Sequence, residues 1–549
     1  MTARSPASVK RLTLIATILG SGIALLDGTV VNVALPTIQR GLGGGLAGQQ
    51  WIVNGYLLTL SSLILVGGSL GDLYGERRVF AIGVGGFGAA SVLCAISPSI
   101  GVLVAARALQ GIAGALLVPS SLAVIVNTFG PDERGAAIGT WTAWGSISTA
   151  LGPLGGGALL AFASWRWIFV INVPLVLICL WLILNVIPPS AREMRDTGEP
   201  ARRVDIPGAL LCAFGLAGPV FALIEQPRLG WSSPAVIVPL IAGVALLAGF
   251  ILYESRAKDP MLPLGLFKRR NFSAGNVETF AMYAGLAIVF FFLVLFLQQI
   301  GGYTPLQSGF ATLPVTIVMF LTARRWGALA DRHGPRFFMG AGPLVAAAGL
   351  LLFQTTGTNA GYVSEVLPAL LLFSIGLSMT VAPLTAAVLA GMERQAGIAS
   401  GVNNAVARVA GLLGTASVGA AVAASFVSTL SSHLSGVPLG PRGQAAVTQA
   451  EQLALGKPSV HGLPPRQAHA VTTAAEAASV HAFHAGMMIA AVLVALGGVV
   501  GFGLIRNPRK SADDVKAGDC GGGQLVGSPN VPAQSDAPGA LVGSAQSSS

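Results

Sequence analysis

Two short stretches of the chain repeat one pattern: Gly68-Ser-Leu-Gly-Asp72-Leu-Tyr-Gly75-Glu-Arg77-Arg78 and Gly327-Ala-Leu-Ala-Asp331-Arg-His-Gly334-Pro-Arg336. Gly, Leu, Asp, Gly and Arg follow one another with the same spacing in both copies. Each copy comes at the end of a long apolar segment, one in each half of the chain. Matching polar turns after matching apolar segments indicate an internal duplication, as in membrane bundles built from two repeats.

The composition indicates a chain that lies in a membrane. Of its 549 residues, 53% are hydrophobic and 10% are charged, whereas a soluble protein carries roughly 25% charged residues. Apolar runs of about 20 residues are long enough to cross the bilayer as helices, and exposed loops or sheet edges cannot face lipid. We predict an all-α integral membrane protein with about 14 spans. They start near Leu12, Trp51, Val79, Ser99, Ala136, Trp167, Asp205, Pro234, Phe272, Pro305, Phe337, Val363, Ile398 and Ala485.

The basic residues predict how the chain is oriented. The net charge is +10, and about 24 of the 32 Lys and Arg residues fall on the side that holds the N-terminus. By the positive-inside rule, both termini are predicted to be cytoplasmic in a multi-pass protein of the cell membrane. The excess of positive charge is therefore a topology signal, and we expect no nucleic-acid partner. Two arginines, Arg107 and Arg408, lie within predicted spans.

The repeat divides the chain into two six-helix halves. Its two copies follow the second and the tenth predicted spans, which leaves spans seven and eight as an extra hairpin. The predicted segments are a cytoplasmic N-terminus (1–11), the first half (12–187), a cytoplasmic linker (188–204), the hairpin (205–254), a cytoplasmic loop (255–271), the second half (272–506) with a long outer loop at about 428–484, and a disordered cytoplasmic tail (507–549).

Further motifs lie on particular spans of this arrangement. They are Leu26-Asp-Gly-Thr-Val-Val-Asn-Val-Ala-Leu-Pro36 on span 1, Leu103-Val-Ala-Ala-Arg-Ala-Leu-Gln-Gly-Ile-Ala-Gly114 on span 4, Ala150-Leu-Gly-Pro-Leu-Gly-Gly-Gly157 on span 5, Trp165-Arg-Trp-Ile-Phe-Val-Ile-Asn-Val-Pro174 at span 6 and Ser400-Gly-Val-Asn-Asn404 on span 13. Together with the repeated turns, they resemble the major facilitator superfamily, and more narrowly its 14-span drug:proton antiporter branch. The first turn departs from the family pattern at Glu76 and the second at Pro335.

Three charged residues are candidates for proton coupling. Asp27 lies deep in the first span, where a carboxylate is costly and usually faces a cavity or a partner. It is predicted to bind and release a proton, the alternative being a static hydrogen bond to a neighbouring helix. Arg107 lies at a similar depth and is expected to border the same cavity, a role that the resemblance supports, or else to clamp two helices. Glu278 in span 9 is a second candidate proton site, unless it reaches the membrane interface.

The repeated turns and the span 5 motif predict a gate. Asp72 and Asp331 are expected to cap helices and pair with neighbouring arginines as latches that open during transport, the alternative being simple loop stabilisation. The Gly-Pro pair of span 5 is expected to bend or pack closely. The predicted gating residues are Gly68, Asp72, Gly75, Arg77, Arg78, Gly152, Pro153, Asp331, Gly334 and Arg336.

Aromatic residues are the candidates for substrate contacts, because an aromatic-lined cavity accepts apolar or cationic compounds. They are Trp51, Tyr56, Trp141, Trp144 and Phe291. The alternative for each is packing against lipid or another helix.

The resemblance implies a proton-coupled antiporter that exports hydrophobic or cationic drugs by alternating access. The alternatives are a dedicated exporter of an endogenous metabolite or antibiotic and, disfavoured by the span 5 motif, an uptake symporter. The chain lacks the phosphate-binding Gly-x-x-x-x-Gly-Lys-Ser/Thr pattern, a metal-ligand cluster and a nucleophile constellation, so we predict no enzyme, cofactor or metal. The expected partners are a small molecule, protons and the bilayer, and the expected state is a monomer.

Overall fold

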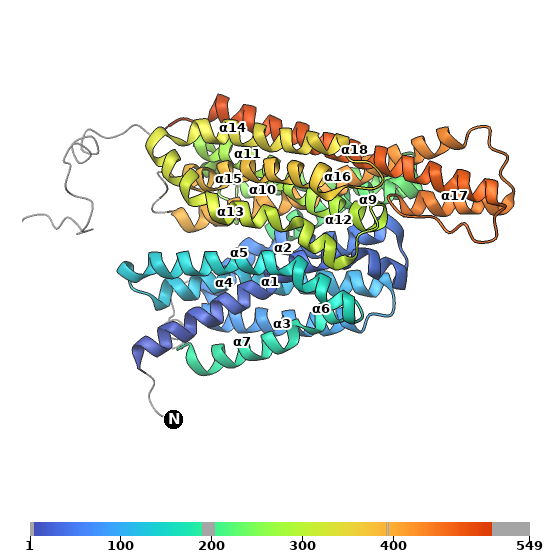
Figure 1. Ribbon diagram of the computed structural model, residues 1–549. Coiled ribbons are helices and arrows are strands. Elements are labelled where there is room, and N and C mark those ends of the chain that lie inside the picture. Colours follow the sequence, from blue (N-terminus) through green and yellow to red (C-terminus); the bar gives the residue numbers. More distant parts are fainter. Residues whose placement is uncertain (1–4, 189–203, 391, 393–394, 508–549) are drawn as a thin grey trace, which may run out of the picture. The chain divides into compact units, whose positions relative to one another are not determined.

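The computed structural model describes residues 5–188, 204–390, 392 and 395–507, and the regular elements in these ranges are all helices (Figure 1). Fourteen of the described helical segments are long and apolar enough to cross a membrane, which confirms the predicted fold class. Each satisfies its backbone hydrogen bonds internally, as a span in lipid must.

The first half, coloured blue to cyan in Figure 1, is built from seven helical segments. They are α1 (Pro6–Leu42), α2 (Gly45–Tyr74), α3 (Glu76–Ala95), α4 (Ile100–Thr128), α5 (Pro131–Phe162), α6 (Trp167–Val170) and α7 (Asn172–Val186). The short α6 and α7 together form one span. Helix α1 packs on α4, α5 and α7, while α2 and α3 pack on α4.

The second half repeats this plan with longer outer extensions. After η1 (Leu264–Lys268), its segments are α11 (Arg270–Ile288), η2 (Val289–Leu293), α12 (Val294–Gln299), α13 (Pro305–His333), α14 (Pro335–Leu352), η3 (Phe353–Thr355), η4 (Tyr362–Val366), α15 (Leu367–Leu389), α16 (Ala396–Leu434), α17 (Pro441–Leu453) and α18 (Pro465–Leu504). Here η2 is a π-helical turn between α11 and α12 within one span. Such turns commonly mark functional positions in helices.

The two halves meet mainly along two helix pairs, α2 with α16 and α5 with α13, and α1 also contacts α12 and α13. The extra hairpin consists of α9 (Ile206–Leu229) and α10 (Pro234–Glu254). Helix α9 packs on α2 and on α16, so the hairpin contacts one helix from each half, and α10 packs on α9. Most of α10 is exposed, as expected of a helix that faces lipid.

Several helix boundaries differ from the predicted ones. Helix α1 begins at Pro6 with Ser5 as its cap, earlier than the predicted start near Leu12. Much of the segment predicted as an outer loop at about 428–484 is helical, because α16 continues to Leu434, α17 lies within the segment and α18 already begins at Pro465. The Ala-rich sequence of 465–484 favours helix although it is less apolar than a span. The linker 189–203 and the tail 508–549 lie outside the described residues.

Two ends of the bundle are needed to describe the site. We call the end that holds the α2–α3 turn at Gly75 the basic end, because most of the basic turns lie there. The opposite end, with the α1–α2 turn at Gly43–Gly45, is the distal end. At the distal end one apolar cluster joins residues of both halves, including Ile38 and Leu46 of the first and Ile300 and Leu455 of the second. This packing closes the distal end.

Candidate functional site

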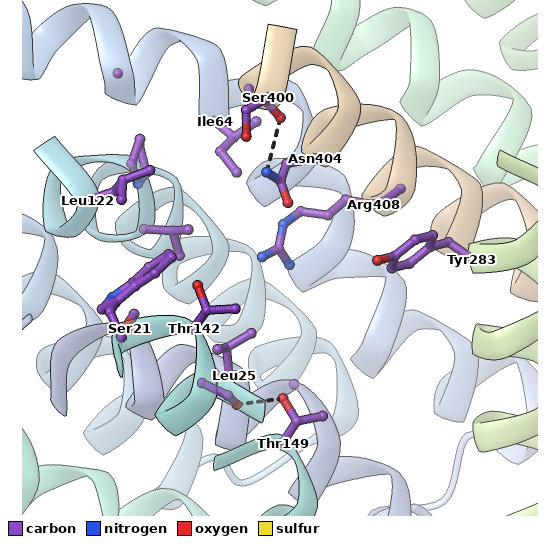
Figure 2. Close-up of a pocket in the computed structure, with 18 of the residues that line it drawn as sticks. Ser21, Leu25, Ile64, Leu122, Thr142, Thr149, Tyr283, Ser400, Asn404 and Arg408 are labelled. Carbon is purple, nitrogen blue, oxygen red and sulfur yellow. Dashed lines mark hydrogen bonds between the residues drawn. The ribbon is translucent and has the colours of Figure 1, made fainter. Parts of the chain in front are cut away.

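A cavity of about 2550 Å³ lies between the two halves. Its walls come from α1, α2, α4 and α5 on one side and from α11, α13 and α16 on the other (Figure 2). At the basic end, its lining includes Asp72 and Glu76 at the ends of helices and Lys258 in the loop after α10. No described residue of the α1–α2 turn lines it. The cavity therefore opens toward the basic end and is closed toward the distal end.

Two of the five aromatic residues predicted to contact substrate line this cavity. Trp141 of α5 and Phe291 of η2 both contribute to its wall. The other three do not line it in the observed conformation. Trp51 donates a hydrogen bond of 2.9 Å to Glu225 in the hairpin, and Trp144 is on an exposed side of α5. Aromatic content alone does not specify which face of a span meets the cavity.

Tyr56, the third of these, lies beneath a buried arginine. The guanidinium carbon of Arg107 is 4.3 Å from the centroid of the Tyr56 ring, a cation–π arrangement. Arg107 also donates from Nε to the carbonyl oxygen of Ile52, at 3.2 Å. Tyr56 thus stabilises the position of Arg107 and does not form part of the cavity wall.

Asp27 and Arg107 form a buried ion pair within the first half. Asp27 is 0% exposed and Arg107 is 1% exposed, and Nη1 of Arg107 donates to Oδ2 of Asp27. The other carboxylate oxygen accepts hydrogen bonds from Gln110 at 3.0 Å and from Asn172 at 3.1 Å. Both amides also donate to the hydroxyl of Ser91. Helices α1, α3, α4 and α7 are therefore joined by one polar network around a single carboxylate.

This network lies behind the cavity wall. Helix α1 presents Leu25, Gly28 and Thr29 to the cavity, while neither Asp27 nor Arg107 lines it. In the observed conformation the Asp27–Arg107 pair therefore does not border the cavity, and its predicted role in proton coupling stays a prediction. The physical reason is helix geometry: successive residues point about 100° apart, so residue 27 faces α4 and α7 when residues 25, 28 and 29 face the cavity.

Glu278 is buried in a different place, between α11 and α18. It is 0% exposed, so its side chain does not extend to the membrane interface. A Cβ atom added at Gly497 of α18 would lie 3.9 Å from Cγ of Glu278. Neither carboxylate oxygen has a hydrogen-bond partner among the described residues. Glu278 does not line the cavity.

The repeated turns occupy equivalent positions in the two halves. Gly75 and Gly334 both have a positive φ, 93° and 87°, which favours glycine between consecutive spans. Arg77 donates to the carbonyl oxygens of Ile183 and Leu184 at the end of α7. Arg336 donates to the carbonyl oxygen of Phe502 near the end of α18. In each half, the arginine of the turn thus binds the end of the last helix.

The remaining residues of these turns differ between the halves. Gly68, Asp72 and Arg78 line the mouth of the cavity. Asp331 is exposed and forms no hydrogen bond or ion pair with any residue that the structure describes. The latch predicted at Asp331 is therefore not formed in this conformation.

The glycines of the span 5 motif allow α5 to approach two helices closely. A Cβ at Gly152 would lie 2.0 Å from Oγ1 of Thr29 in α1, and Pro153 follows directly in the same buried face. A Cβ at Gly157 would lie 2.7 Å from Cα of Leu306, at the start of α13 in the other half. The motif therefore forms part of the contact that closes the distal end.

The sequence also matches a known family along most of its length. Residues 17–415 match the model described as Major Facilitator Superfamily. The chain belongs to the major facilitator superfamily. It is thus a multi-pass membrane transporter, and transporters of this superfamily bind small-molecule substrates.

Relatives of this major facilitator transporter include proteins named for resistance and export. Puromycin resistance protein pur8 of Streptomyces alboniger is 36% identical over 419 residues, 75% of this chain and 81% of that protein. Tetracenomycin C resistance and export protein of Streptomyces glaucescens is 34% identical over 509 residues, 92% and 93% of the two chains. Multidrug resistance protein Stp of Mycobacterium tuberculosis is 35% identical over 426 residues, 77% and 78%. These relatives confirm the predicted resemblance.

Solved structures show the same fold. A bacterial homolog of the human lysosomal transporter Spinster, in an inward-facing conformation, gives a TM-score of 0.62 at 15% identity and covers 91% of this chain and 99% of that chain. The xylose transporter XylE from E. coli, in an inward open conformation, gives 0.56 at 14% identity, with 93% and 99% covered.

An arginine that the sequence placed within a span, but to which no role was assigned, also lines the cavity. Arg408 of α16 lines the cavity of this major facilitator transporter beside Asn404, and Tyr283 of α11 lies across from it (Figure 2). Its Nε atom is buried without a hydrogen-bond partner among the described residues. The signal in the sequence was an arginine within an apolar span, which membrane helices carry at a cost.

Proposed function

We propose that this transporter is a proton-driven antiporter that exports hydrophobic drugs or antibiotics from the cytoplasm. The names of the relatives support export as the direction and antibiotics or drugs as the substrates. The observation that carries the coupling mechanism is the buried Asp27–Arg107 pair in a bundle with a cavity open at one end. A charged pair within a membrane bundle is costly and is typical of ion pathways.

The orientation follows from the charges of the turns. The basic end lies in the cytoplasm of the proposed transporter, since positively charged loops remain on that side. The open cavity of the observed conformation then faces the cytoplasm, from which an exporter takes its substrate. The chain acts in the cell membrane, and the monomer is the proposed unit because one bundle encloses a complete cavity.

The coupling step uses the charge balance around Asp27. While Asp27 is ionised, Arg107, Gln110 and Asn172 all donate hydrogen bonds to it and hold α1 against α4 and α7. A proton arriving from outside neutralises this carboxylate, and the attraction for Arg107 is lost. The helices of the first half then move relative to one another, and the protonated state favours release of the substrate outward. Deprotonation toward the cytoplasm restores the network.

The gate follows from the contacts at each end. At the distal end, the close approach of Gly157 to Leu306 opens when the halves rotate. At the basic end, the turns with Arg77 and Arg336 keep each last helix attached to its half as it moves. Glu278 is proposed as a second proton site, because it is a buried carboxyl group with no partner among the described residues.

The test is substrate-triggered proton release in inverted, respiring vesicles that contain a pH-sensitive dye. The test panel contains hydrophobic compounds of different charge, among them ethidium and puromycin, for which one relative is named as a resistance protein. Wild type is expected to release protons with at least one compound of the panel, and Asp27→Asn is expected to abolish that release. Asp132→Asn is the matched control, because Asp132 is exposed at the start of α5. Release that persists in Asp27→Asn would move the coupling site elsewhere, with Glu278→Gln tested next.

A dedicated exporter of one self-made antibiotic is the second candidate. It is favoured by the relative named for tetracenomycin C resistance and export, which matches along 92% of this chain. For such an exporter, the same vesicle assay would show no proton release with a panel of unrelated drugs and proton release with the one antibiotic that it exports.

A further inference from the structure

The charges that line the cavity are distributed unevenly along its depth. All four lining carboxylates lie at helix ends or in turns of the basic end: Asp72, Glu76, Asp205 and Asp259. Farther in, the charged residues among those described as lining it are the two arginines Arg324 and Arg408. Arg324 lies about 14 Å from the basic end of α13, and Arg408 about 18 Å from that of α16, at 1.5 Å per residue. The inner cavity is thus positively charged.

Arg408 has no counter-charge of its own. It forms no hydrogen bond or ion pair with any described residue. The nearby acid of the first half, Asp27, is bound to Arg107 and does not line the cavity. In Figure 2 the guanidinium group of Arg408 points away from α16 into the space between the halves. The positive charge of a guanidinium group is costly at this depth when it has few partners. A negative group that enters the cavity would stabilise that charge.

We infer that Arg408 binds an acidic group of the exported compound, so that the inner cavity prefers amphipathic aromatic anions, such as carboxylates or phenolates, to cations. The inference rests on the proposed export function and names the chemical class of its substrate. A guanidinium group can donate two parallel hydrogen bonds to a carboxylate. Tyr283 and Asn404 flank this position with further polar groups (Figure 2).

The rest of the wall suits the apolar body of such a compound. Leu25, Leu57, Phe290 and Phe291 line the cavity from both halves. Aromatic and aliphatic side chains around one charged group are typical of sites that bind a ring system and orient it by one polar substituent. A cation in the same position would meet the positive charge of Arg408 without a compensating carboxylate at that depth.

The test compares three fluorescent probes that share one ring system: 1-pyrenebutyric acid, its primary amide and 1-pyrenebutylamine. Binding is measured at neutral pH to the full-length protein in phosphatidylcholine nanodiscs, with empty nanodiscs subtracted. This lipid carries no net charge, so anionic headgroups cannot occupy the site. Wild type is expected to bind the acid about ten-fold or more tightly than the amide, because charge-assisted hydrogen bonds are strong. The amine is expected to bind more weakly than the amide.

Arg408→Gln is expected to bind the amide as wild type does but to lose the preference for the acid. Arg408→Lys is expected to keep part of the preference for the acid. Arg442→Gln, an exposed arginine on α17, is the matched control and should behave as wild type. A wild type without preference for the acid, or an Arg408→Gln that keeps it, would overturn the inference. If Arg408→Gln does not fold, Arg408→Met is judged by the same criterion. This binding assay is independent of proton release, so either proposal can fail without the other.

Discussion

The two halves share a helical plan but treat their buried charges in opposite ways. In the first half, both oxygens of Asp27 accept hydrogen bonds and its charge is balanced by Arg107. In the second half, Glu278 and Arg408 lie on different helices, and neither has an ionic partner among the described residues. The duplication thus preserved the backbone, and each half acquired separate chemistry: a closed network suited to a proton and an open cation suited to a substrate.

Breaking the ion pair of the first half is expected to have the largest effect. Arg107→Ala leaves the carboxylate of Asp27 buried without its counter-charge, which typically costs about 3–5 kcal/mol. We expect a large loss of thermal stability in detergent and no transport. The double variant Asp27→Asn/Arg107→Gln should recover part of the stability, since the uncompensated charge is gone. No recovery would mean that the pair is not the main interaction at this position.

The second largest effect is expected at the close contact between the two halves at the distal end. Gly157→Ala would place a Cβ 2.7 Å from Cα of Leu306, and such overpacking typically costs about 1–3 kcal/mol. We expect lower thermal stability and reduced export. Gly155→Ala is the matched control, because nothing lies within 4 Å of a Cβ at that position. Equal effects of the two substitutions would contradict the proposed contact.

Substitutions of the equivalent arginines in the two repeated turns are expected to lower the stability of the protein by similar amounts. Arg77→Gln removes hydrogen bonds to the end of α7, and Arg336→Gln removes one to the end of α18. Because both side chains are partly exposed, we expect each to cost only about 1 kcal/mol, measured by thermal unfolding. Strongly unequal losses would show that the two turns are not equivalent in energy.

The smallest effect is expected at Glu278. An ionised group without a partner is very costly in an apolar interface, so the uncharged isostere in Glu278→Gln should be tolerated within about 1 kcal/mol. Thermal unfolding of Glu278→Gln and Asp27→Asn, measured side by side, sharpens the contrast between the halves. A Glu278→Gln variant as unstable as Asp27→Asn would indicate a charged partner that forms at Glu278.

The sequence predicted the fold from features that act locally. Apolar length gave the spans, and the spacing of Gly75 and Gly334 matched two turns with positive φ. Asp27 and Arg107 were recognisable as a pair of costly charges at a similar depth. Which side of a helix meets the cavity depends on the rotation of each helix against its neighbours. For this reason the sequence alone did not show that Trp51 lies away from the cavity of this conformation, or that Arg408, recognised within a span, lines it.

The start of α18 was also not predictable from hydropathy. The sequence of 465–484 is too polar for a span, yet its many alanines continue α18 beyond the apolar run. Hydropathy alone therefore does not show that α18 begins at Pro465, before its apolar run. Local helix propensity, considered separately from hydropathy, was the signal that could have corrected this boundary.

The central claim is that coupling resides at Asp27, apart from the cavity that binds the substrate. The most direct measurement compares two modes of transport in proteoliposomes that contain Asp27→Asn: uptake driven by a pH gradient, and exchange of labelled for unlabelled substrate without a gradient. Our account predicts that the exchange continues at close to the wild-type rate while the gradient-driven uptake is lost. Uptake that still follows the pH gradient in Asp27→Asn would contradict it.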